Sequence, residues 1–593
     1  MVTPKLQARP DLTGSFGMCA TTHWTASSTA QAVLERGGNA FDAATAAAFV
    51  LHIVEPHLNG PGGDLVALIG RAGAPVRVLV GQGPAPQMAS IDHFRAEGLD
   101  MVPGSGALAA TVPGAVEAWL LLLRDYGTWK LGDILEFAIH YADHGHPILP
   151  RAAGVIDTVA DLFRNHWPTS AEVWLSAEGS APSAGAVVRN GSYAATLRAL
   201  IAATDSADRV MQIDAARREW SEGFVARAVI DFVATVKHRH STGSDHHGIL
   251  SLSDLQGFRA SFEEPLYANF RGITVVKAGT WTQGPVLLQT LAILAGYHDR
   301  DLDLETPAGV HRAVEALKLA MADRDSYYGE RTPRRQIATL LSPSYAAARR
   351  DLITDRASGV FRPGLIGANP YMPPLVLEDC LSLSPTVGEP TVSLSGQTRG
   401  DTCHLDVVDK WGNMIAATPS GGWLQSSPAI PGLGFCLGTR LQMSWLDEAS
   451  PSALAPGCRP RTTLSPTMLV RGGQVISALG TPGGDQQDQW QLLYLLRTLI
   501  GNHTPQEAIE APAFHTTSFP ASFWPRTWTP AGLVAEDRLG DEVIDELQER
   551  GHHVTRAGDW TLGRLSSVTR DPYSGLLGAA ANPRGAQGYA VGR

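Results

Sequence analysis

The decisive stretch of this sequence reads Gly400-Asp401-Thr402-Cys403-His404-Leu405-Asp406-Val407-Val408-Asp409-Lys410-Trp411-Gly412-Asn413. Its alternating residues predict a β-strand, and the Trp-Gly-Asn that follows is typical of a hairpin turn. If the peptide bond before Thr402 were cut, this strand would begin with a free α-amine beside a hydroxyl group. Such a residue carries its own general base, because the amine can take the hydroxyl proton. Alone the pattern says little, since most threonines at the start of strands simply favour β-structure.

The length, composition and charge of the chain limit the classes of protein to which it can belong. The chain has 593 residues, of which 44% are hydrophobic and 18% charged, so it can bury a large core. The formal net charge of −11 argues against nucleic acid as the main partner, because nucleic-acid binding requires a basic face.

The ends of the chain and its cysteines predict a compartment. Residues 1–14 are polar and lack the apolar run of a secretory signal, and the longest apolar segment, 43–54, is too short to span a bilayer. The cysteines are odd in number, with no disulfide or zinc spacing, at positions 19, 380, 403, 436 and 458. We therefore expect a cytoplasmic protein that does not associate with membranes and has no disulfide framework.

Helical patterns dominate the first two-thirds of the chain and strand patterns the last third. The predicted helices include residues 25–36, 40–54, 113–126, 131–143, 286–294, 307–328, 486–500, 505–511 and 540–551. The predicted strands include 65–69, 272–277, 403–409, 414–418, 467–471, 474–479 and a last hairpin at 565–582. Residues 329–400 are rich in loop-forming residues, as a cleavable segment would be. This distribution favours one layered α/β sandwich over two autonomous domains.

Two segments resemble ligand-binding motifs, a phosphate loop and a metal site, but their sequences do not support either function. The glycine loop at residues 55–64 lacks the Gly-Lys-Ser/Thr of a phosphate loop and leads into a strand, so we reject nucleotide binding. Residues 237–248 contain four histidines, His238, His240, His246 and His247, without helical spacing or enough companion carboxylates for a metal. We predict an exposed loop there and no metal site.

Two further segments carry groups that suit acyl chemistry. The run Gly480-Thr481-Pro482-Gly483-Gly484-Asp485 lies between a predicted strand and helix, where Gly483 and Gly484 can aim backbone N–H groups at an oxyanion. The run from Arg459 to Thr467 places Arg461, Thr462 and Thr463 at a strand entrance, where they suit a substrate carboxylate. Each segment alone is also consistent with turn-capping and surface charge.

Seven ordered motifs together resemble the gamma-glutamyltranspeptidase family of N-terminal-nucleophile hydrolases. They cover most of the chain: Gly37-Gly38-Asn39-Ala40-Phe41-Asp42-Ala43-Ala44 with Val54-Glu55-Pro56-His57, Val112-Pro113-Gly114-Ala115-Val116, Thr402 with Val407-Val408-Asp409, Gly412-Asn413, Ser465-Pro466-Thr467, Thr481-Pro482-Gly483-Gly484 and Ala581-Asn582-Pro583-Arg584-Gly585. The resemblance implies a four-layer αββα sandwich and a precursor that cuts itself before Thr402. Residues 1–401 would form a large subunit and residues 402–593 a small one, joined as an αβ heterodimer or an α2β2 assembly.

The resemblance also implies individual roles. Thr402 would be the nucleophile, first in self-cleavage and then in an acyl-enzyme. Gly483 and Gly484 would supply the oxyanion-hole amides, and Thr462 and Thr463 would match the family's paired serines at the substrate carboxylate. Ser420 falls where the family has a second threonine beside the nucleophile, so we expect it to support Thr402.

Three departures from the family pattern concern the substrate. The family's arginine for the α-carboxylate of glutamate should fall near Ile91, its asparagine is replaced by Gly422, and its acidic residue for the α-amine should lie near Trp445. A buried substrate charge without its partner would lose about 2–5 kcal/mol. We therefore expect γ-glutamyl compounds to be poor substrates. The nearby aromatic residues Trp423, Trp445 and Trp490 suggest an apolar acyl or leaving group, although each is equally consistent with core packing.

The leading interpretation is an autoprocessed threonine hydrolase of amide bonds, similar to the branch that includes oxamate amidohydrolases and acylases. Its substrate would be a small amide or keto acid, with Thr462, Thr463, Arg461 and Trp423 as binding residues and no cofactor or metal. Relatives in alkylproline antibiotic pathways suggest an alternative, cleavage of a carbon–carbon bond by the same nucleophile. A non-processing binding protein is a third possibility. Cys403 is the alternative nucleophile, with cleavage one bond later.

Overall fold

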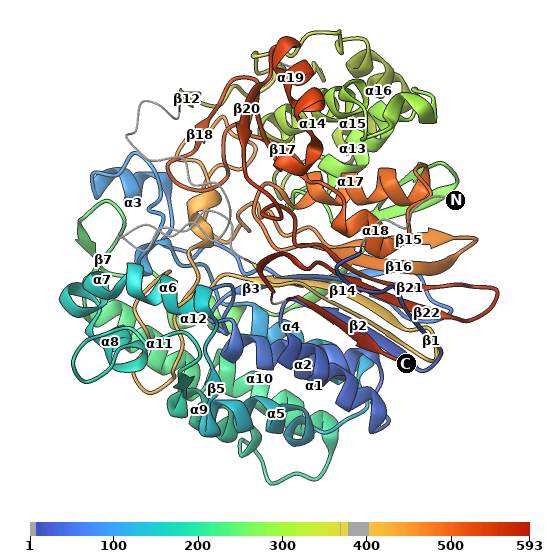
Figure 1. The fold of residues 1–593 in the computed structure, drawn as a ribbon. Helices are drawn as coiled ribbons and strands as arrows, with labels where there is room; N and C mark the ends of the chain where they lie inside the picture. Colours follow the sequence, from blue (N-terminus) through green and yellow to red (C-terminus); the bar gives the residue numbers. More distant parts are fainter. Residues whose placement is uncertain (1–6, 368, 378–401, 587) are drawn as a thin grey trace.

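Two seven-stranded β-sheets lie face to face at the centre of the structure, and helices cover the outer face of each (Figure 1). The computed structural model describes residues 7–367, 369–377, 402–586 and 588–593. The predicted loop-rich segment 329–400 thus lies partly outside the described residues. Its described part is not all loop, because it contains the helices α15 (Arg334–Leu340) and α16 (Pro343–Arg350).

The first sheet carries the strand that follows Thr402, and its neighbouring strands are all antiparallel. Its order is β23 (Tyr589–Gly592), β2 (Gly17–Thr21), β13 (Leu405–Asp409), β14 (Met414–Ser420), β3 (Asp64–Gly70), β4 (Arg77–Gly81) and β9 (Ser261–Glu263). On its outer side, α1 (Trp24–Glu35), α2 (Ala40–Val54) and α4 (Ala115–Tyr126) contact the sheet. The helices α5 (Leu131–His144), α9 (Gly191–Ile201), α10 (Arg209–Ser221) and α11 (Phe224–Thr235) pack against these helices or against one another. The predicted range of α2 is confirmed to the residue.

The second sheet carries the strand that leads into the Gly483-Gly484 loop. Its order is β1 (Leu12–Gly14), β22 (Leu577–Ala581), β21 (Ser566–Arg570), β16 (Gln474–Gly480), β15 (Thr467–Arg471), β11 (Ile273–Lys277) and β10 (Leu266–Phe270). The helices on its side of the molecule are α13 (Pro285–Leu294), α14 (Pro307–Tyr327), α16, α17 (Gln487–Leu499), α18 (Pro505–Glu510) and α19 (Asp541–Glu549). The predicted four-layer αββα sandwich is therefore confirmed.

Each sheet combines strands from both sides of Thr402. In the first sheet, β13, β14 and β23 pair with strands that precede residue 402, and the second sheet mixes its strands in the same way. The short early strands β1, β2 and β4 and the late β23 were not predicted. β1, β2 and β23 pair with strands hundreds of residues away, which local patterning does not report, whereas β4 pairs with its hairpin neighbour β3.

The alternation of side chains along β13 decides which residues can meet the second sheet. Cys403, Leu405 and Val407 belong to the apolar cluster beneath the helices of the first sheet, whereas Val408 belongs to the cluster between the sheets. Because successive strand residues point to opposite faces, Thr402 and His404 face the second sheet.

The remaining elements form the rim around this sandwich. The short helices are α3 (Ile91–Ala96), α6 (Pro150–Thr158), α7 (Ala160–His166), α8 (Pro168–Trp174) and α12 (Leu252–Gly257). The short strands are β5 (His146–Pro147), β6 (Val187–Val188), β7 (His238–Arg239), β8 (Asp245–His246), β12 (Val376–Leu377), β17 (Phe514–Thr516), β18 (Thr527–Trp528), β19 (Gly532–Ala535) and β20 (His553–Arg556).

The prediction of an exposed loop over residues 237–248 was wrong. The segment is a hairpin of β7 and β8, and His238 and His240 are buried. His240 Nε2 lies 2.6 Å from His246 Nδ1, and its Nδ1 lies 3.0 Å from the Thr242 hydroxyl. These bonds engage both ring nitrogens of His240, and His246 Nε2 lies 3.0 Å from Glu97 Oε2. Among the described residues, no helix is both long and apolar enough to cross a membrane.

Candidate active site

Thr402 lies buried at the head of the strand, with its side chain between the two sheets. It forms an isolated antiparallel bridge with Ser420, the last residue of β14. Its Oγ1 is 3.1 Å from Ser420 Oγ and 3.3 Å from the carbonyl oxygen of Gly483. The structure therefore brings together three residues that the sequence had separated by up to 81 positions.

The backbone beyond Ser420 is closely packed, and a Cβ on Gly422 would lie 2.7 Å from Gly63 N. Gly421 and Gly422 have positive φ angles of 72° and 63°. A Cβ on Gly60 or Gly63 would lie 2.2 Å from the carbonyl oxygen of Gly422 or Ser420, respectively. The glycine loop at residues 55–64, for which sequence analysis rejected nucleotide binding, thus packs its backbone directly against the backbone at the end of β14.

The Gly483-Gly484 loop faces Thr402 from the second sheet. Gly483 has a φ of 119°, and its carbonyl accepts hydrogen bonds from Thr402 and from the side-chain amide of Gln487. Gly484 N–H donates to Gln486 Oε1 over 3.2 Å. Since Gln486 is only half-buried, a substrate oxygen could displace its side chain from this amide. The oxyanion role of the two glycines remains a prediction.

A buried histidine and a buried aspartate connect β13, the strand that follows Thr402, to the second sheet. His404 Nδ1 lies 2.9 Å from Thr418 Oγ1, and its Nε2 lies 2.9 Å from Asp406 Oδ1. Ser566 of β21 donates to the other oxygen of Asp406 over 2.9 Å. A Cβ on Gly480 would lie 2.2 Å from the His404 ring, so only glycine fits at the end of β16. This network fixes the spacing between the Thr402 strand and the loop that begins at Gly480.

Cys403 points away from the site, towards the helices. Its thiol is fully buried, lies 3.0 Å from Glu55 Oε2 and accepts a hydrogen bond from Asn59 Nδ2 over 3.2 Å. Burial raises the pKa of the Cys403 thiol well above its usual value, and the neighbouring Glu55 carboxylate raises it further. A thiol that stays protonated is a poor nucleophile. This geometry disfavours the alternative in which Cys403 leads the small chain.

The predicted carboxylate-binding residues lie buried beside β15. Thr462 N–H donates to Trp281 O over 2.9 Å, and its hydroxyl accepts from Leu464 N–H. Thr463 Oγ1 is buried and has no hydrogen-bond partner among the described residues. Arg461 Nη2 reaches Ser522 Oγ at 3.1 Å and Asp325 Oδ1 at 3.3 Å.

Sequence reasoning missed the charged residues that connect this segment to the glycine loop. Asp485, directly after Gly484, accepts from the backbone N–H and the hydroxyl of Ser522, at 2.8 Å and 2.6 Å, and pairs with Arg324. Burial opposes ionisation of Asp485, but the Arg324 charge and the Ser522 hydrogen bonds hold its pKa below the usual value. Arg324 and Asp325 form their own 3.0 Å ion pair. The signal was the run of three consecutive charged residues, Asp323 to Asp325, in the buried last part of α14.

The three aromatic residues predicted near the site have different positions. Trp423 clusters with Met443 and Phe523, next to Ser522. Trp445 lies beneath the Arg526 guanidinium, whose carbon is 3.8 Å from the ring centroid. Trp490 belongs instead to the core between the second sheet and its helices, beside His515. Of the two alternatives that the sequence left open for Trp490, the structure supports core packing.

Position 91, where the family places a carboxylate-binding arginine, is part of an apolar cluster. Ile91 is 7% exposed and packs in a group that includes Phe94, Leu441 and Leu446. The buried Arg440 is paired with Asp64, the first residue of β3, at 2.7 Å and 2.9 Å. The structure thus has no arginine at the family's position.

One other cluster contains residue types that bind metals. His311, Glu315 and His552 lie together and are buried. However, His311 Nδ1 lies 2.9 Å from His552 Nε2, its Nε2 lies 2.7 Å from Thr354 O, and Glu315 is paired with Lys318 and Arg362. Both His311 nitrogens and the Glu315 carboxylate are thus engaged within the protein, and two cations adjoin the carboxylate, so we assign this cluster a structural role.

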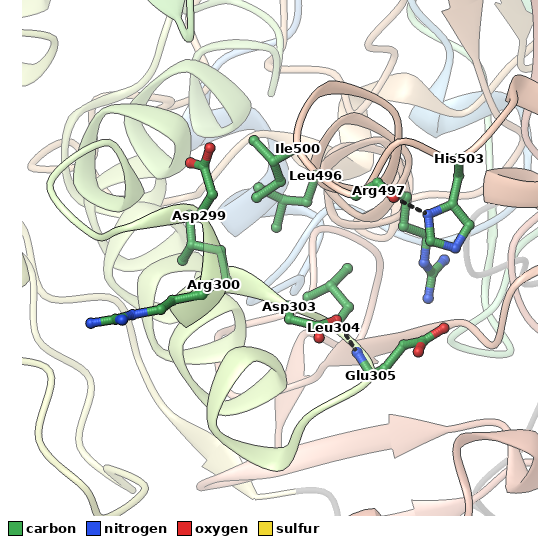
Figure 2. Close-up of a pocket in the computed structure, with 11 residues that line it drawn as sticks. Asp299, Arg300, Asp303, Leu304, Glu305, Leu496, Arg497, Ile500 and His503 are labelled. Carbon is green, nitrogen blue, oxygen red and sulfur yellow. Dashed lines mark hydrogen bonds between the residues drawn. The ribbon is translucent and has the colours of Figure 1, made fainter.

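An open cavity of about 310 Å³ lies at the far end of α17 from the glycine loop (Figure 2). Residues 299–305 line one side, and residues from Leu496 to His503 line the other. None of the predicted site residues lines it, and we connect it with no part of the reaction.

A four-layer αββα sandwich, with a hydroxyl residue at the head of an inner strand and a glycine loop facing it, is the architecture of the N-terminal-nucleophile hydrolases. The gamma-glutamyltranspeptidase family model matches residues 26–592, and the chain belongs to this family.

Named relatives and solved structures agree with this assignment. The chain is 30% identical to the oxamate amidohydrolase proenzyme of Klebsiella pneumoniae over 98% of both chains. The solved structure of LmbA2991HD is 49% identical, with a TM-score of 0.94, and the match covers 99% of this chain and 100% of that one. Cephalosporin acylase from Bacillus halodurans is 27% identical with a TM-score of 0.81, over 100% and 99% of the two chains. The protein is a proenzyme-type amidohydrolase of this family.

Proposed function

We propose that this protein cuts itself before Thr402 and then uses Thr402 to hydrolyse an amide of a small, non-γ-glutamyl acyl compound. The observation that carries the proposal is the position of the Thr402 hydroxyl, buried between the sheets, 3.1 Å from Ser420 Oγ and 3.3 Å from Gly483 O. The large subunit would be residues 1–401 and the small one residues 402–593. Since both sheets contain strands from each part, the two would stay associated as a heterodimer.

In the proposed reaction the free amine of Thr402 takes the proton from its own hydroxyl. The oxygen attacks the substrate carbonyl, and the amides of Gly483 and Gly484 stabilise the tetrahedral oxyanion. The amine leaves with the proton, the acyl group remains as an ester on Thr402, and water then attacks this ester to release the acid. Ser420 would orient the Thr402 hydroxyl through their hydrogen bond.

The absence of the family's glutamate-binding charges supports a non-glutamyl substrate. Ile91 lies among apolar side chains, and Trp445 carries the Arg526 cation on its ring where an acidic side chain would be needed for an α-amine. A substrate ammonium group near Arg526 would meet repulsion. The acyl group would instead contact Trp423, Thr462, Thr463 and Arg461.

The test is a panel of amides with the purified, processed protein. Acyl amides without an α-amine should be cleaved at least about thirtyfold faster, in kcat/KM, than the matched γ-glutamyl amides. Thr402→Ala should remove activity towards all of them, whereas Thr402→Ser should retain part of it. Equal or preferred use of γ-glutamyl amides would contradict the proposal. A β-diketo acid in the same panel tests the carbon–carbon alternative, because its cleavage releases a carbon acid instead of an amine.

A further inference from the structure

The two glycines of the Gly483-Gly484 loop have no side chains that could hold their backbone amides in place. Gly483 has a φ of 119°, a conformation that residues with a side chain rarely adopt. On one side of the loop, Gly480 at the end of β16 pairs with Ser566 in the sheet. The position of the Gly484 amide therefore also depends on what holds the residue on the other side, Asp485.

Asp485, the residue that follows the two glycines, is buried and is held by both its side chain and its backbone. Its carboxylate accepts a hydrogen bond from Arg324 and two from Ser522, from the backbone N–H over 2.8 Å and from the hydroxyl over 2.6 Å. Its backbone carbonyl accepts from the side-chain amides of Gln283 over 3.3 Å and Gln489 over 3.2 Å. Neither the carboxylate nor the peptide group of Asp485 can turn without breaking several of these bonds.

Arg324 is the cation among these contacts, and it joins three segments of the chain. It lies in the last turn of α14 and is fully buried. Its Nη1 donates to Asp485 Oδ1 and, over 2.7 Å, to Gln283 Oε1. Its Nη2 donates to the carbonyl oxygen of Pro520 over 3.0 Å, and its guanidinium carbon lies 4.9 Å from the centroid of the Phe519 ring. One guanidinium therefore fixes the glycine loop relative to two other loops.

The charge of Arg324 is needed as well as its hydrogen bonds. Arg324 pairs with Asp485 and, over 3.0 Å, with its own neighbour Asp325, and all three residues are buried. Removal of one partner from a buried ion pair leaves an uncompensated charge. Since burial opposes the ionisation of Asp485, loss of the Arg324 charge would raise the pKa of Asp485. The carboxyl group would then take up a proton or move towards water, and either change would disturb the bonds that hold the residue after Gly484.

We propose that Arg324 is a positioning residue of the reaction, which acts through Asp485 to hold the Gly484 amide where the oxyanion forms. The inference rests on the proposed function, in which this amide stabilises the tetrahedral oxyanion. Such a donor must lie about 2.7–3.1 Å from the developing charge, and the loss of one donor lowers kcat by about 100- to 1,000-fold. A displaced donor should cost part of that factor. Because Arg324 is enclosed by protein and acts on the transition state alone, its loss should change kcat and not KM.

The first experiment measures kcat and KM for the amide of the panel that wild-type protein cleaves fastest, with rates normalised to the amount of small chain on a denaturing gel. Arg324→Gln should lower kcat by about tenfold to a hundredfold and change KM by less than about threefold. Arg324→Lys keeps the charge with fewer donors and should retain more of kcat, which serves if the glutamine variant does not fold.

A double variant tests whether Arg324 acts through Asp485. Asp485→Asn alone should also lower kcat, because its side chain loses the ion pair. In Arg324→Gln/Asp485→Asn no buried carboxylate at position 485 is left without its cation. The loss of kcat should therefore be smaller than the product of the two single losses. Losses that simply multiply would show that Arg324 acts by another route and would contradict the proposal.

A matched control is Arg349→Gln. Arg349 is also buried, pairs with Asp323 of the same helix at 3.4 Å and donates to two backbone carbonyls. Within the described part of the chain, neither Arg349 nor Asp323 forms a hydrogen bond with Asp485 or the glycine loop. This variant should lose stability in a urea titration but keep kcat within about threefold of wild type. Equal losses of kcat in the two variants, a change confined to KM, or a wild-type kcat in Arg324→Gln would overturn the proposal.

Hydrogen–deuterium exchange separates this inference from the proposed function. If no amide in the panel is cleaved, the hydrolase proposal fails, but the anchoring of the loop can still be measured. Deuterium uptake in peptic peptides that cover residues 481–487 should be at least about threefold faster in Arg324→Gln than in wild type, and unchanged in Arg349→Gln. Peptides from residues 565–582 should keep the wild-type rate in both variants. Unchanged uptake over residues 481–487 in Arg324→Gln, or the same increase in both variants, would refute the role of Arg324.

Discussion

Thr402 and Cys403 are neighbours in the chain but lie in different chemical environments. Thr402 faces the second sheet beside Ser420 and the Gly483 carbonyl, whereas Cys403 faces the helices beside Glu55 and Asn59. Successive residues of a β-strand point to opposite faces, and this alternation favours Thr402 over Cys403 as the candidate nucleophile. The chemistry of the two side chains alone could not separate them. Thiolates are stronger nucleophiles than alcohols, but this thiol is buried next to a carboxylate and has a raised pKa.

The first prediction concerns self-cleavage. Cys403→Ala should still yield two bands on a denaturing gel, because the thiol contacts only the helical side. Thr402→Ala should remain a single band and lose activity by about a thousandfold or more. A Cys403→Ala protein that stays unsplit, beside a Thr402→Ala protein that splits, would transfer the nucleophile role to the thiol.

The second prediction concerns the glycine that packs on His404. In Gly480→Ala the new Cβ would lie 2.2 Å from the ring, which must shift and disturb its bonds to Thr418 and Asp406. Overpacking of this kind should cost about 1–3 kcal/mol in unfolding free energy, measured by urea titration. The control is Gly154→Ala in α6, where nothing lies within 4 Å of the added methyl. An equal change in both variants would show that the His404 contact is unimportant.

At the scale of elements, one side chain couples the hairpin of β13 and β14 to the start of α2. Asp409 accepts hydrogen bonds from the backbone of Trp411 and Asn413 in the turn, and its second oxygen accepts from Ala40 N–H at the helix N-terminus. The turn that sequence analysis identified by Trp-Gly-Asn is therefore anchored to a helix more than 360 residues earlier.

The third prediction tests that coupling. Asp409→Ala leaves three backbone N–H groups without their acceptor, so it should lower the unfolding free energy by about 2–4 kcal/mol in a urea titration. Asp409→Asn retains acceptor capacity on one oxygen and should lose less. If both variants had the same unfolding free energy as wild type, the turn would not depend on the Asp409 carboxylate.

Elements with strong local signals were predictable, whereas those defined by distant partners were not. The Ala-rich pattern ending at Glu55 predicted α2 correctly, and the hairpins after residue 402 were found from alternation and turn residues. The strands β2 and β23 were missed because both are short and rich in small residues. They form only by pairing with each other and with β13. The β7–β8 hairpin was missed because its histidines resemble a polar loop until their mutual hydrogen bonds are seen.

At the scale of the whole molecule, the candidate site combines segments that no sequence window contains. Thr402, Ser420, Gly483 and Arg461 could each be picked out from local motifs. The buried charges around Arg461 could not, because Arg324 comes from the last turn of α14 and Arg526 from the loop between β17 and β18. Only tertiary packing brings these charges together, so sequence reasoning identified the local motifs of the site better than the groups that pack around them.

Buried histidines give the whole molecule a predictable acid sensitivity. Burial lowers the pKa of His515 to about 4, and its Nδ1 has no partner among the described residues. The unfolded chain binds the His515 proton below its ordinary pKa of about 6.5, whereas the folded chain does not until about pH 4. Stability should therefore fall as pH drops through this window, by up to about 1.4 kcal/mol per pH unit from this residue.

The fourth prediction isolates that residue. The difference in unfolding free energy between His515→Phe and wild type should shift in favour of the variant by about 2–3 kcal/mol between pH 7 and pH 4.5, from urea titrations at each pH. His93→Phe is the control, because the His93 side chain is only half-buried. A pH-independent difference for His515→Phe would contradict a neutral buried imidazole.

The most direct test of the central claim is mass spectrometry of the purified wild-type protein before and after exposure to a slowly turned-over amide. The small chain should begin at Thr402, and after exposure its first residue should carry the mass of the acyl group. An active protein whose chain is uncut, or whose small chain begins at Cys403, would contradict the account.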